Sequence, residues 1–129
     1  MSGKVALDTS IVVPYLKRDP NLLLLIRDVD EVLIPFIVVG ELFFGAFNST
    51  RIAQNVIRVK DFCRDNIILS YSNEIAEEYG KIKAELKTKG RPIPENDIWI
   101  GAVARFHRIK LVTRDDHFTN ISNLSIVKW

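Results

Sequence analysis

The sequence predicts an α/β fold, specifically a three-layer α/β/α sandwich with a parallel five-stranded sheet. First, five short runs rich in β-branched and apolar residues alternate with longer segments of helical periodicity. Second, a helical segment between successive strands requires parallel crossover connections, because antiparallel neighbours need only tight turns. Third, the 129 residues contain no repeat or low-complexity tract, so we expect one domain spanning residues 1–129.

The first half of the chain supplies two of the expected strands and three of the expected helices. The expected elements are a buried strand at 5–8, helices at 11–16 and 20–27, a strand at 31–35 and a helix at 37–47. Pro20 suits a first helical turn, where its missing N–H is no loss. Pro35 ends the second strand, because it cannot donate to a ladder. The segment 37–47 is apolar nearly all round, which predicts a buried helix.

The second half is expected to add three helices and three strands. An amphipathic helix at 51–64 precedes a strand at 67–70. Ser72 is a typical N-cap for the long helix that follows, and Gly90 is a typical stop for it. Prolines at 92 and 94 precede a helix that runs to about His107. The last expected elements are strands at 110–113 and 125–127.

Composition excludes several classes of protein. Lys and Arg total 18 against 16 Asp and Glu, a formal net charge of +2, which by itself indicates no particular partner. Cys63 is the only cysteine, which excludes an internal disulfide framework and a cysteine-based zinc cluster. An acid, Asp8, interrupts the N-terminal segment before a signal-peptide core can form, and no apolar run is long enough to cross a bilayer. We therefore expect a cytoplasmic protein without a membrane association.

Four acidic residues occupy positions at which an ionised carboxylate has a high free-energy cost. Asp8 and Asp115 follow predicted strands, Glu41 interrupts an apolar helix, and Asp97 lies in the first turn of another. Ligands bind beyond the carboxyl ends of parallel strands, so the strand-end acids lie where a site is expected. Taken singly, Asp8 has an ordinary reading as a turn residue, and Asp97 as a favourable charge at the positive end of a helix.

A carboxylate in apolar surroundings must be paired, protonated or bound to a metal. Arg114 is the only basic residue immediately beside any of the four acids, and in a strand-to-loop segment it tends to point to the opposite face. Clustered carboxylate oxygens suit a hard divalent cation such as Mg²⁺ or Mn²⁺. The pattern therefore predicts a metal site.

Four motifs contain these acids and occur in order along the chain. They are Leu7-Asp8-Thr9-Ser10, Gly40-Glu41-Leu42, Pro94-Glu95-Asn96-Asp97 with Trp99-Ile100-Gly101-Ala102, and Leu111-Val112-Thr113-Arg114-Asp115-Asp116-His117-Phe118. With these motifs the sequence resembles the PIN-domain ribonucleases, and among them the VapC-type toxins of toxin–antitoxin pairs, over residues 5–127. The resemblance implies a PIN-like α/β sandwich and a metal-dependent endoribonuclease that uses Mg²⁺ or Mn²⁺ and leaves 5′-phosphate and 3′-hydroxyl ends.

Carried over by position, the family's acidic quartet falls on Asp8, Glu41, Asp97 and Asp115. Asp8 and Asp97 are then the firmest metal ligands, and Asp115 binds directly or through water. Glu41 completes the shell or orients a water. The adjacent Asp116 is the other candidate for the fourth acid, and we favour Asp115 because it directly follows Thr113-Arg114.

Other residues are expected to support this site. The hydroxyls of Thr9, Ser10 and Thr113 fall beside the quartet, where they can hold carboxylates or a phosphate. Arg114 is the best single candidate for an RNA phosphate contact.

Lys89 and Arg91 belong to a basic cluster that either binds the RNA backbone or is simply a solvated helix end. For His107 and His117 we favour ordinary surface roles over roles as ligands or acids.

The resemblance also implies partners: an RNA substrate, a cognate antitoxin, and a second copy in a homodimer or higher assembly. Apolar residues within 22–26 and 52–62 could supply such interfaces, although core packing explains them equally well. The antitoxin is hypothesised to place a basic side chain among the carboxylates or to displace the metal.

Two other functions stay open on the sequence alone. One is a PIN-like module that binds RNA or protein without catalysis. The other is a metal-dependent phosphatase, although the haloacid-dehalogenase type needs a second Asp where Ser10 stands.

Overall fold

A computed structural model of the chain describes residues 3–129. Its five strands are all parallel and pair in the order β3-β2-β1-β4-β5. The α/β prediction with a parallel five-stranded sheet is therefore confirmed. The strands are β1 (Lys4–Leu7), β2 (Glu31–Pro35), β3 (Ile67–Leu69), β4 (Lys110–Thr113) and β5 (Ile126–Lys128).

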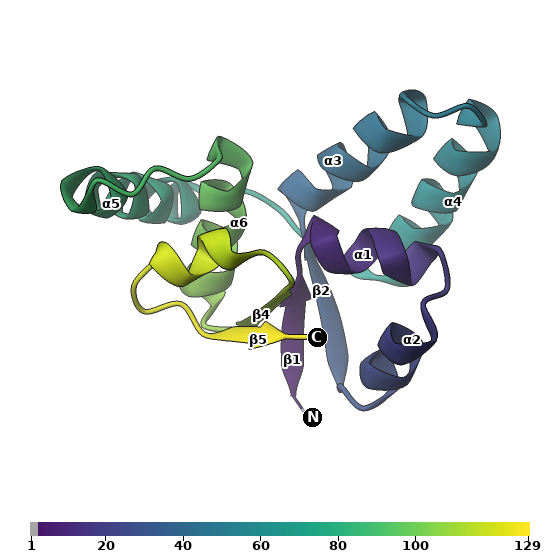
Figure 1. Ribbon diagram of the computed structural model, residues 1–129, viewed down its shortest axis with the longest axis horizontal. Helices are drawn as coiled ribbons and strands as arrows, with labels where there is room; N and C mark the ends of the chain where they lie inside the picture. Colours follow the sequence, from purple (N-terminus) through teal and green to yellow (C-terminus); the bar gives the residue numbers. More distant parts are fainter. Residues whose placement is uncertain (1–2) are drawn as a thin grey trace.

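Helices lie on both sides of this sheet (Figure 1), with α5 and α6 on one side and α1, α2 and α4 on the other. Within residues 3–129, no helix is both long enough and apolar enough to span a membrane. The helices are α1 (Thr9–Leu16), α2 (Pro20–Arg27), α3 (Phe36–Phe47), α4 (Ile52–Asp65), α5 (Asn73–Lys89), α6 (Glu95–His107) and the short 3-10 helix η1 (Asp116–Asn120).

The strand order creates a crevice beside β1. The chain builds β2 and β3 on one side of β1 and then returns to add β4 and β5 on the other side. Open parallel sheets bind their ligands at such a reversal, beyond the carboxyl ends of the strands. Leu7 pairs with Val112, so Asp8 and Thr113 emerge together at this point.

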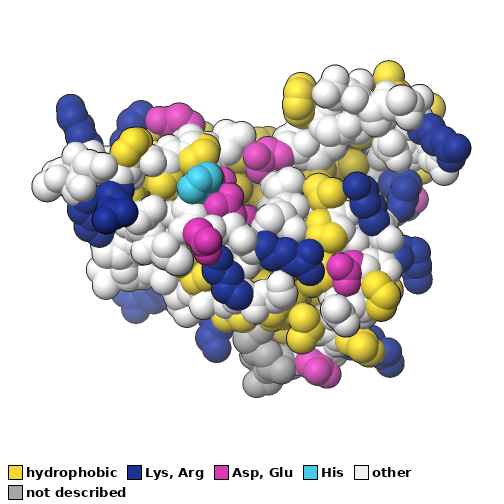
Figure 2. Space-filling model, viewed as in Figure 1, with side chains coloured by type: hydrophobic (Ala, Val, Ile, Leu, Met, Phe, Trp, Pro, Cys, Tyr) yellow, Lys and Arg dark blue, Asp and Glu magenta, His cyan; other side chains and the backbone are white. Residues whose placement is uncertain are grey.

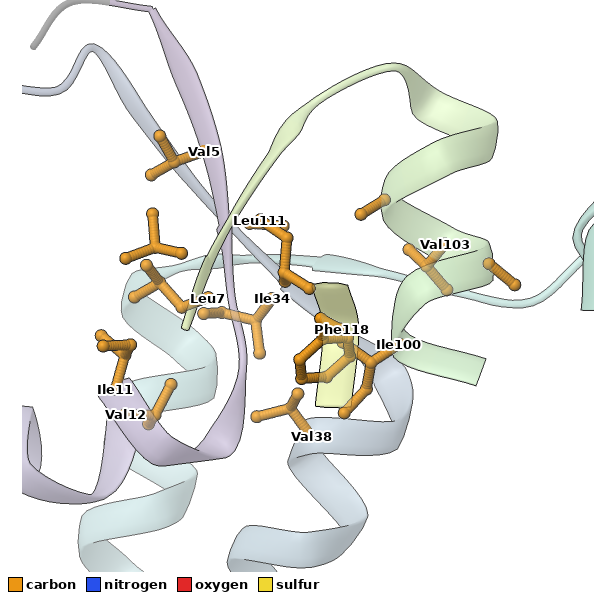
Figure 3. Packing of buried hydrophobic residues seen from close by; sticks show 14 of the residues in the cluster. Val5, Leu7, Ile11, Val12, Ile34, Val38, Ile100, Val103, Leu111 and Phe118 are labelled. Atoms are coloured by element: carbon orange, nitrogen blue, oxygen red, sulfur yellow. The ribbon is translucent and has the colours of Figure 1, made fainter. Parts of the chain in front are cut away.

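The core fills both faces of the central strands. Figure 3 shows Leu111 on the side of Phe118 and α6, whereas Leu7 lies on the side of Ile11 and Val12 of α1. Strands buried on both faces are continuous apolar runs, and β1 and β4 have this pattern. The packing fixes the strand ends from which the acidic residues emerge.

One prediction about the helices is wrong: α3 is not buried all round. Only Val38, Leu42 and Ala46 are buried, whereas Phe44 is 70% exposed and Phe47 is 60% exposed. The reason is that α3 and α4 pack against each other as a pair that extends past the edge of the sheet (Figure 1). An apolar helix surface is therefore left open near the end of β1.

A buried arginine fixes α6 against its neighbours. The Arg105 guanidinium pairs with Glu78 and Glu85 of α5 and donates to the Ser122 carbonyl, 3.1 Å away. Ser122 also donates to Glu85, at 2.9 Å. This network joins α5, α6 and the loop after η1, so it holds the two segments that carry Asp97 and Asp115.

Gly101 allows α6 to pack closely on that loop, and its replacement tests the fit. A Cβ at Gly101 would lie 2.6 Å from Cδ1 of Ile121, so Gly101→Val overpacks the contact. We expect it to lower the free energy of unfolding by about 1–3 kcal/mol, measured by urea denaturation. Gly80→Ala in α5 is the matched control, since a Cβ there meets nothing within 4 Å. It should stabilise the chain by about 0.5–1 kcal/mol; equal losses in both variants would contradict this account.

Candidate active site

The Asp8 carboxylate lies almost completely buried where β1 meets α1. Only 4% of the residue is exposed, so water cannot solvate the carboxylate. Ser10 Oγ donates to Oδ1 at 2.6 Å, and Thr113 Oγ1 donates to Oδ2 at 2.7 Å. Asp8 occupies the N-cap position of α1, yet its side chain does not cap the helix. Both oxygens are instead oriented by hydroxyls from the two neighbouring segments.

Thr113 connects this carboxylate to the fourth acid. Its Oγ1 accepts a hydrogen bond from the Asp115 backbone N–H at 2.9 Å while donating to Asp8. Ser10 Oγ acts similarly, accepting the backbone N–H of Arg114 at 2.9 Å. Two hydroxyls therefore fix the start of the loop after β4 relative to the end of β1.

Asp97, Asp115 and His117 form the second part of the site. His117 Nδ1 lies 3.0 Å from Asp97 Oδ2 and 3.0 Å from Asp115 Oδ1. Asp115 caps η1 by accepting the His117 backbone N–H at 2.9 Å. Asp97 lies in the first turn of α6, where the positive helix end favours a carboxylate. One ligand atom from each of the three residues lies within 4.8 Å of the others.

Glu41 approaches the same region from α3. Thr9 Oγ1 donates to its Oε1 at 2.6 Å, and Asn96 Nδ2 lies 3.5 Å from its Oε2. These contacts join α3 to the first turns of α1 and α6. The side chain is therefore directed toward the cluster rather than into the core.

The acids interact electrostatically as a connected set. Burial raises the pKa of Asp8 above its usual value, and the charge of Asp115 adds to the rise, while the Ser10 and Thr113 hydrogen bonds oppose it. Burial also raises the pKa of Asp97, with further contributions from the charges of Asp115 and Glu41. The charge effects thus couple Asp8 to Asp115, and they couple Asp97 to both Asp115 and Glu41. Figure 2 shows acidic side chains and a histidine in the hollowed middle of this face.

The residues fit a hard divalent cation. The carboxylate oxygens of Asp97 and Asp115 are the ligands that Mg²⁺ or Mn²⁺ prefers, whereas the imidazole nitrogen of His117 beside them is a ligand more typical of softer transition metals. Hydrogen bonding to Asp97 is the main reason that the pKa of His117 is raised, so the acids already favour a positive group between them. A cation at this position would favour the ionised form of both aspartates, against the burial and the neighbouring negative charges that raise their pKa values.

Several expected site residues lie apart from the cluster. Asp116 has a side chain that is 92% exposed and pairs with Lys128, which lowers its pKa. Arg114 Nε donates to the Trp129 carbonyl at 3.0 Å, and its Nη2 lies 3.7 Å from Asp19.

Lys89 and Arg91 are exposed at the end of α5 and in the next loop. Lys89 Nζ lies 3.5 Å from the Asn120 carbonyl. The structure thus places the quartet with Thr9, Ser10 and Thr113, but it does not place these basic residues there.

Two residues at the site were not identified from the sequence. His117, for which a surface role was favoured, contacts two of the four acids. Its position two residues after Asp115, at the start of a tight helical turn, was the available signal. Asn96 precedes Asp97 directly, but nothing in its sequence neighbourhood indicates a contact with Glu41.

Residues 5–124 match the PIN domain family. The chain is 35% identical to Ribonuclease VapC2 of Haemophilus influenzae, and the alignment covers 98% of each chain. Its fold is similar to VapBC2 of Rickettsia felis bound to a promoter DNA fragment, with a TM-score of 0.87, 30% identity and 98% coverage of each chain. DNA-bound VapBC of Salmonella typhimurium gives a TM-score of 0.92 at 27% identity, again over 98% of each chain.

The raised aspartate pKa values predict how pH and metal affect stability. From about pH 4, the ordinary aspartate value, up to the raised pKa values of Asp8 and Asp97, the folded state binds more protons than the unfolded state. The metal-free chain should therefore lose stability as pH rises through this window. At pH 8 Asp97→Asn should raise its melting temperature by about 2–4 °C. Added Mn²⁺ should stabilise the wild type at pH 8 and not at pH 4, as measured by thermal denaturation.

Asp116→Asn is the control for this experiment, because the Asp116 side chain faces Lys128 rather than the cluster. It should keep the full Mn²⁺ response, whereas Asp97→Asn should lose most of it. A wild type that melts at the same temperature with and without Mn²⁺ at pH 8 would contradict the metal site.

Proposed function

The chain belongs to the PIN-domain family, and from this we propose that it is a divalent-metal-dependent endoribonuclease, the toxin of a VapBC-type toxin–antitoxin pair. The observation that carries the proposal is the cluster of Asp97, Asp115 and His117, whose ligand atoms lie within 4.8 Å of one another. It lies beyond the strand ends where the strand order reverses and Asp8 emerges. A divalent cation there would neutralise carboxylates whose ionised form burial makes costly. The relatives named Ribonuclease VapC supply the substrate class.

Within this proposal Asp8, Asp97 and Asp115 hold Mg²⁺ or Mn²⁺, and Glu41 completes the site. A bound divalent cation supplies hydroxide at neutral pH and neutralises charge on phosphate oxygens. His117 lies between Asp97 and Asp115, so its imidazole either moves aside or joins the ligands when the cation binds.

The chain's own hydrogen bonds determine how each acid acts. Ser10 and Thr113 hold both oxygens of Asp8 in one orientation, which favours its ionised form. Thr9 occupies Oε1 of Glu41 and leaves Oε2 with only a long contact to Asn96. Oε2 is therefore the atom that we expect to orient the attacking water and accept its proton.

Basic residues contribute to RNA binding at a distance from the acids. Arg114 can reach a phosphate only by leaving Asp19 and the Trp129 carbonyl. Lys89 and Arg91 are exposed and can attract the RNA backbone to the end of α5 through counterion release. An RNA substrate also puts the proposed activity in the cytoplasm.

A groove between α1, α3 and α4 suits the proposed antitoxin. It has a volume of about 380 Å³, and its lining includes Glu41 and the small residues Gly45 and Ala46. A bound segment can thus reach the carboxylates, as expected of an inhibitor that inserts a basic side chain. The solved relatives described as VapBC complexes support such a partner.

Exposed apolar residues elsewhere support the proposed homodimer. Of the two segments expected to provide interfaces, Leu22 and Phe62 belong to the core, whereas Leu24 and Ile57 stay about 60% exposed. Self-association through α2 or α4 would cover these side chains.

RNA cleavage tests the proposed activity directly. The purified chain, free of antitoxin, should cut RNA only with Mg²⁺ or Mn²⁺ and leave 5′-phosphate ends. Asp97→Asn should reduce the rate by at least about 100-fold, because loss of a ligand costs no less than loss of a supporting group. Gel assays of a defined RNA and sequencing of the ends provide the measurement.

Asp116→Asn serves as the matched control and should keep full activity. RNA binding without cleavage under either metal would favour a non-catalytic module. Release of inorganic phosphate from small phosphate esters would favour a phosphatase.

A substitution in the groove tests the antitoxin proposal separately. Gly45→Leu projects into the groove, where a Cβ meets nothing within 4 Å, so the chain should fold normally. We expect unchanged RNA cleavage and at least about tenfold weaker inhibition by the cognate antitoxin, since a side chain would overlap a buried partner. Titration of RNase activity with purified antitoxin measures both. If the complex of the wild type with its antitoxin cleaved RNA at the rate of the free wild type, the proposal that the antitoxin inhibits cleavage would be wrong.

A further inference from the structure

A second hollow adjoins the carboxylates on the opposite side of α3 from the antitoxin groove. It has a volume of about 620 Å³, within the ~300–1,000 Å³ typical of ligand sites. It lies between α3 and the first turns of α1 and α6. Its lining residues are Thr9, Phe36, Ile37, Gly40, Glu41, Phe44 and Asn96.

Two phenylalanines form the apolar part of this hollow. Phe36 is 52% exposed and Phe44 is 70% exposed, an unfavourable state for large aromatic side chains in water. They lie eight residues apart on α3, roughly two turns, with Gly40 between them. The glycine leaves space between the two rings, where a third flat group can enter.

The remaining part of the hollow is polar. Glu41, Asn96 and Thr9 form one hydrogen-bonded group along its edge. The Asn96 amide donates only one long hydrogen bond to Glu41, so its other N–H and its oxygen can serve a ligand. Aromatic faces beside an amide and a carboxylate match a nucleobase, which has flat faces and a polar edge.

We propose that this hollow binds one base of the RNA, stacked on Phe44 or Phe36, next to the phosphodiester that is cut. The inference rests on the proposed ribonuclease activity. Glu41 belongs to both the hollow and the acidic quartet, so a base held here adjoins the phosphate at the cation. Burial of the two phenylalanines by a protein partner is the competing outcome, and sedimentation of the Phe44→Ala variant tests it.

Neighbouring aromatic rings keep Phe36 in place. Its ring lies 6.5 Å from that of Tyr71, which makes an edge contact with Trp99 at 5.4 Å. Trp99 stacks on Tyr79 of α5 with the centroids 4.0 Å apart. A ring supported in this way loses little freedom on binding, which favours stacking.

Steady-state cleavage of a short single-stranded RNA tests the subsite. Phe44→Ala should raise KM by about 5- to 100-fold with kcat little changed, the range that loss of one base–aromatic stack gives. Phe44→Trp should keep KM close to the wild-type value, because a larger ring still stacks. Phe47→Ala is the matched control: Phe47 is 60% exposed on the same helix but lies outside the hollow and packs near Phe43.

An abasic substrate identifies the ligand as a base. The test uses a series of RNAs, each with one abasic ribose at a different position near the cleavage point. One RNA of the series should have a raised KM for the wild type. For that RNA, Phe44→Ala should cause no further loss. The same comparison with Phe36→Ala shows whether the Phe36 ring also stacks on the base.

The outcomes separate this inference from the function on which it rests. If the wild type cuts no RNA, the ribonuclease proposal fails, and the base subsite fails with it. Two results would refute only the subsite, provided that the wild type cuts RNA. One is a normal KM for Phe44→Ala, and the other is a KM that Phe44→Ala raises by the same factor on intact and on abasic RNA. A change in sedimentation for Phe44→Ala, with no dependence on the abasic position, would instead assign the two rings to a protein interface.

Discussion

The burial of one carboxylate, that of Asp8, is the constraint on which the arrangement of the site depends. A carboxylate removed from water must regain hydrogen bonds from the protein, and Ser10 and Thr113 provide them. Because these hydroxyls belong to α1 and β4, the compensation is possible only where β4 lies beside β1. Thr113 then orients the backbone of Asp115, so the position of the fourth acid follows from that of the first. The relative position of these two acids therefore depends on the pairing of β1 with β4.

Much of the fold could be predicted from local patterns. Pro20 and Gly90 lie where proline and glycine begin and end helices, and the structure places helix ends there. The pairing order of the strands is a long-range property that no local pattern contains. The misjudged burial of α3 has a similar cause. Periodicity shows that a helix is apolar on every side, but it does not show where that helix leaves the sheet and meets solvent.

The candidate site was predictable to the extent that acids in apolar surroundings are unusual. Asp8 and Glu41 stand out because their neighbours in sequence are apolar. His117 does not stand out, because a histidine in a polar loop is ordinary until the fold brings α6 beside it. The separation of Asp116 from the cluster depends on Lys128, a residue of the last strand. Such contacts between distant segments require the assembled structure.

The hydrogen bond between Thr113 and Asp8 spans 105 positions of the chain. During synthesis on the ribosome, β1 leaves the ribosome before β4 does, so β1 lacks this partner strand until β4 has also been made. The incomplete polypeptide therefore holds its first acid without the fourth, and it cannot assemble the full set of negative groups. An enzyme that degrades RNA would otherwise endanger the message and the machinery that are still producing it. Under the proposed activity, the order of the strands thus delays the assembly of the acidic set until β4 has been synthesised.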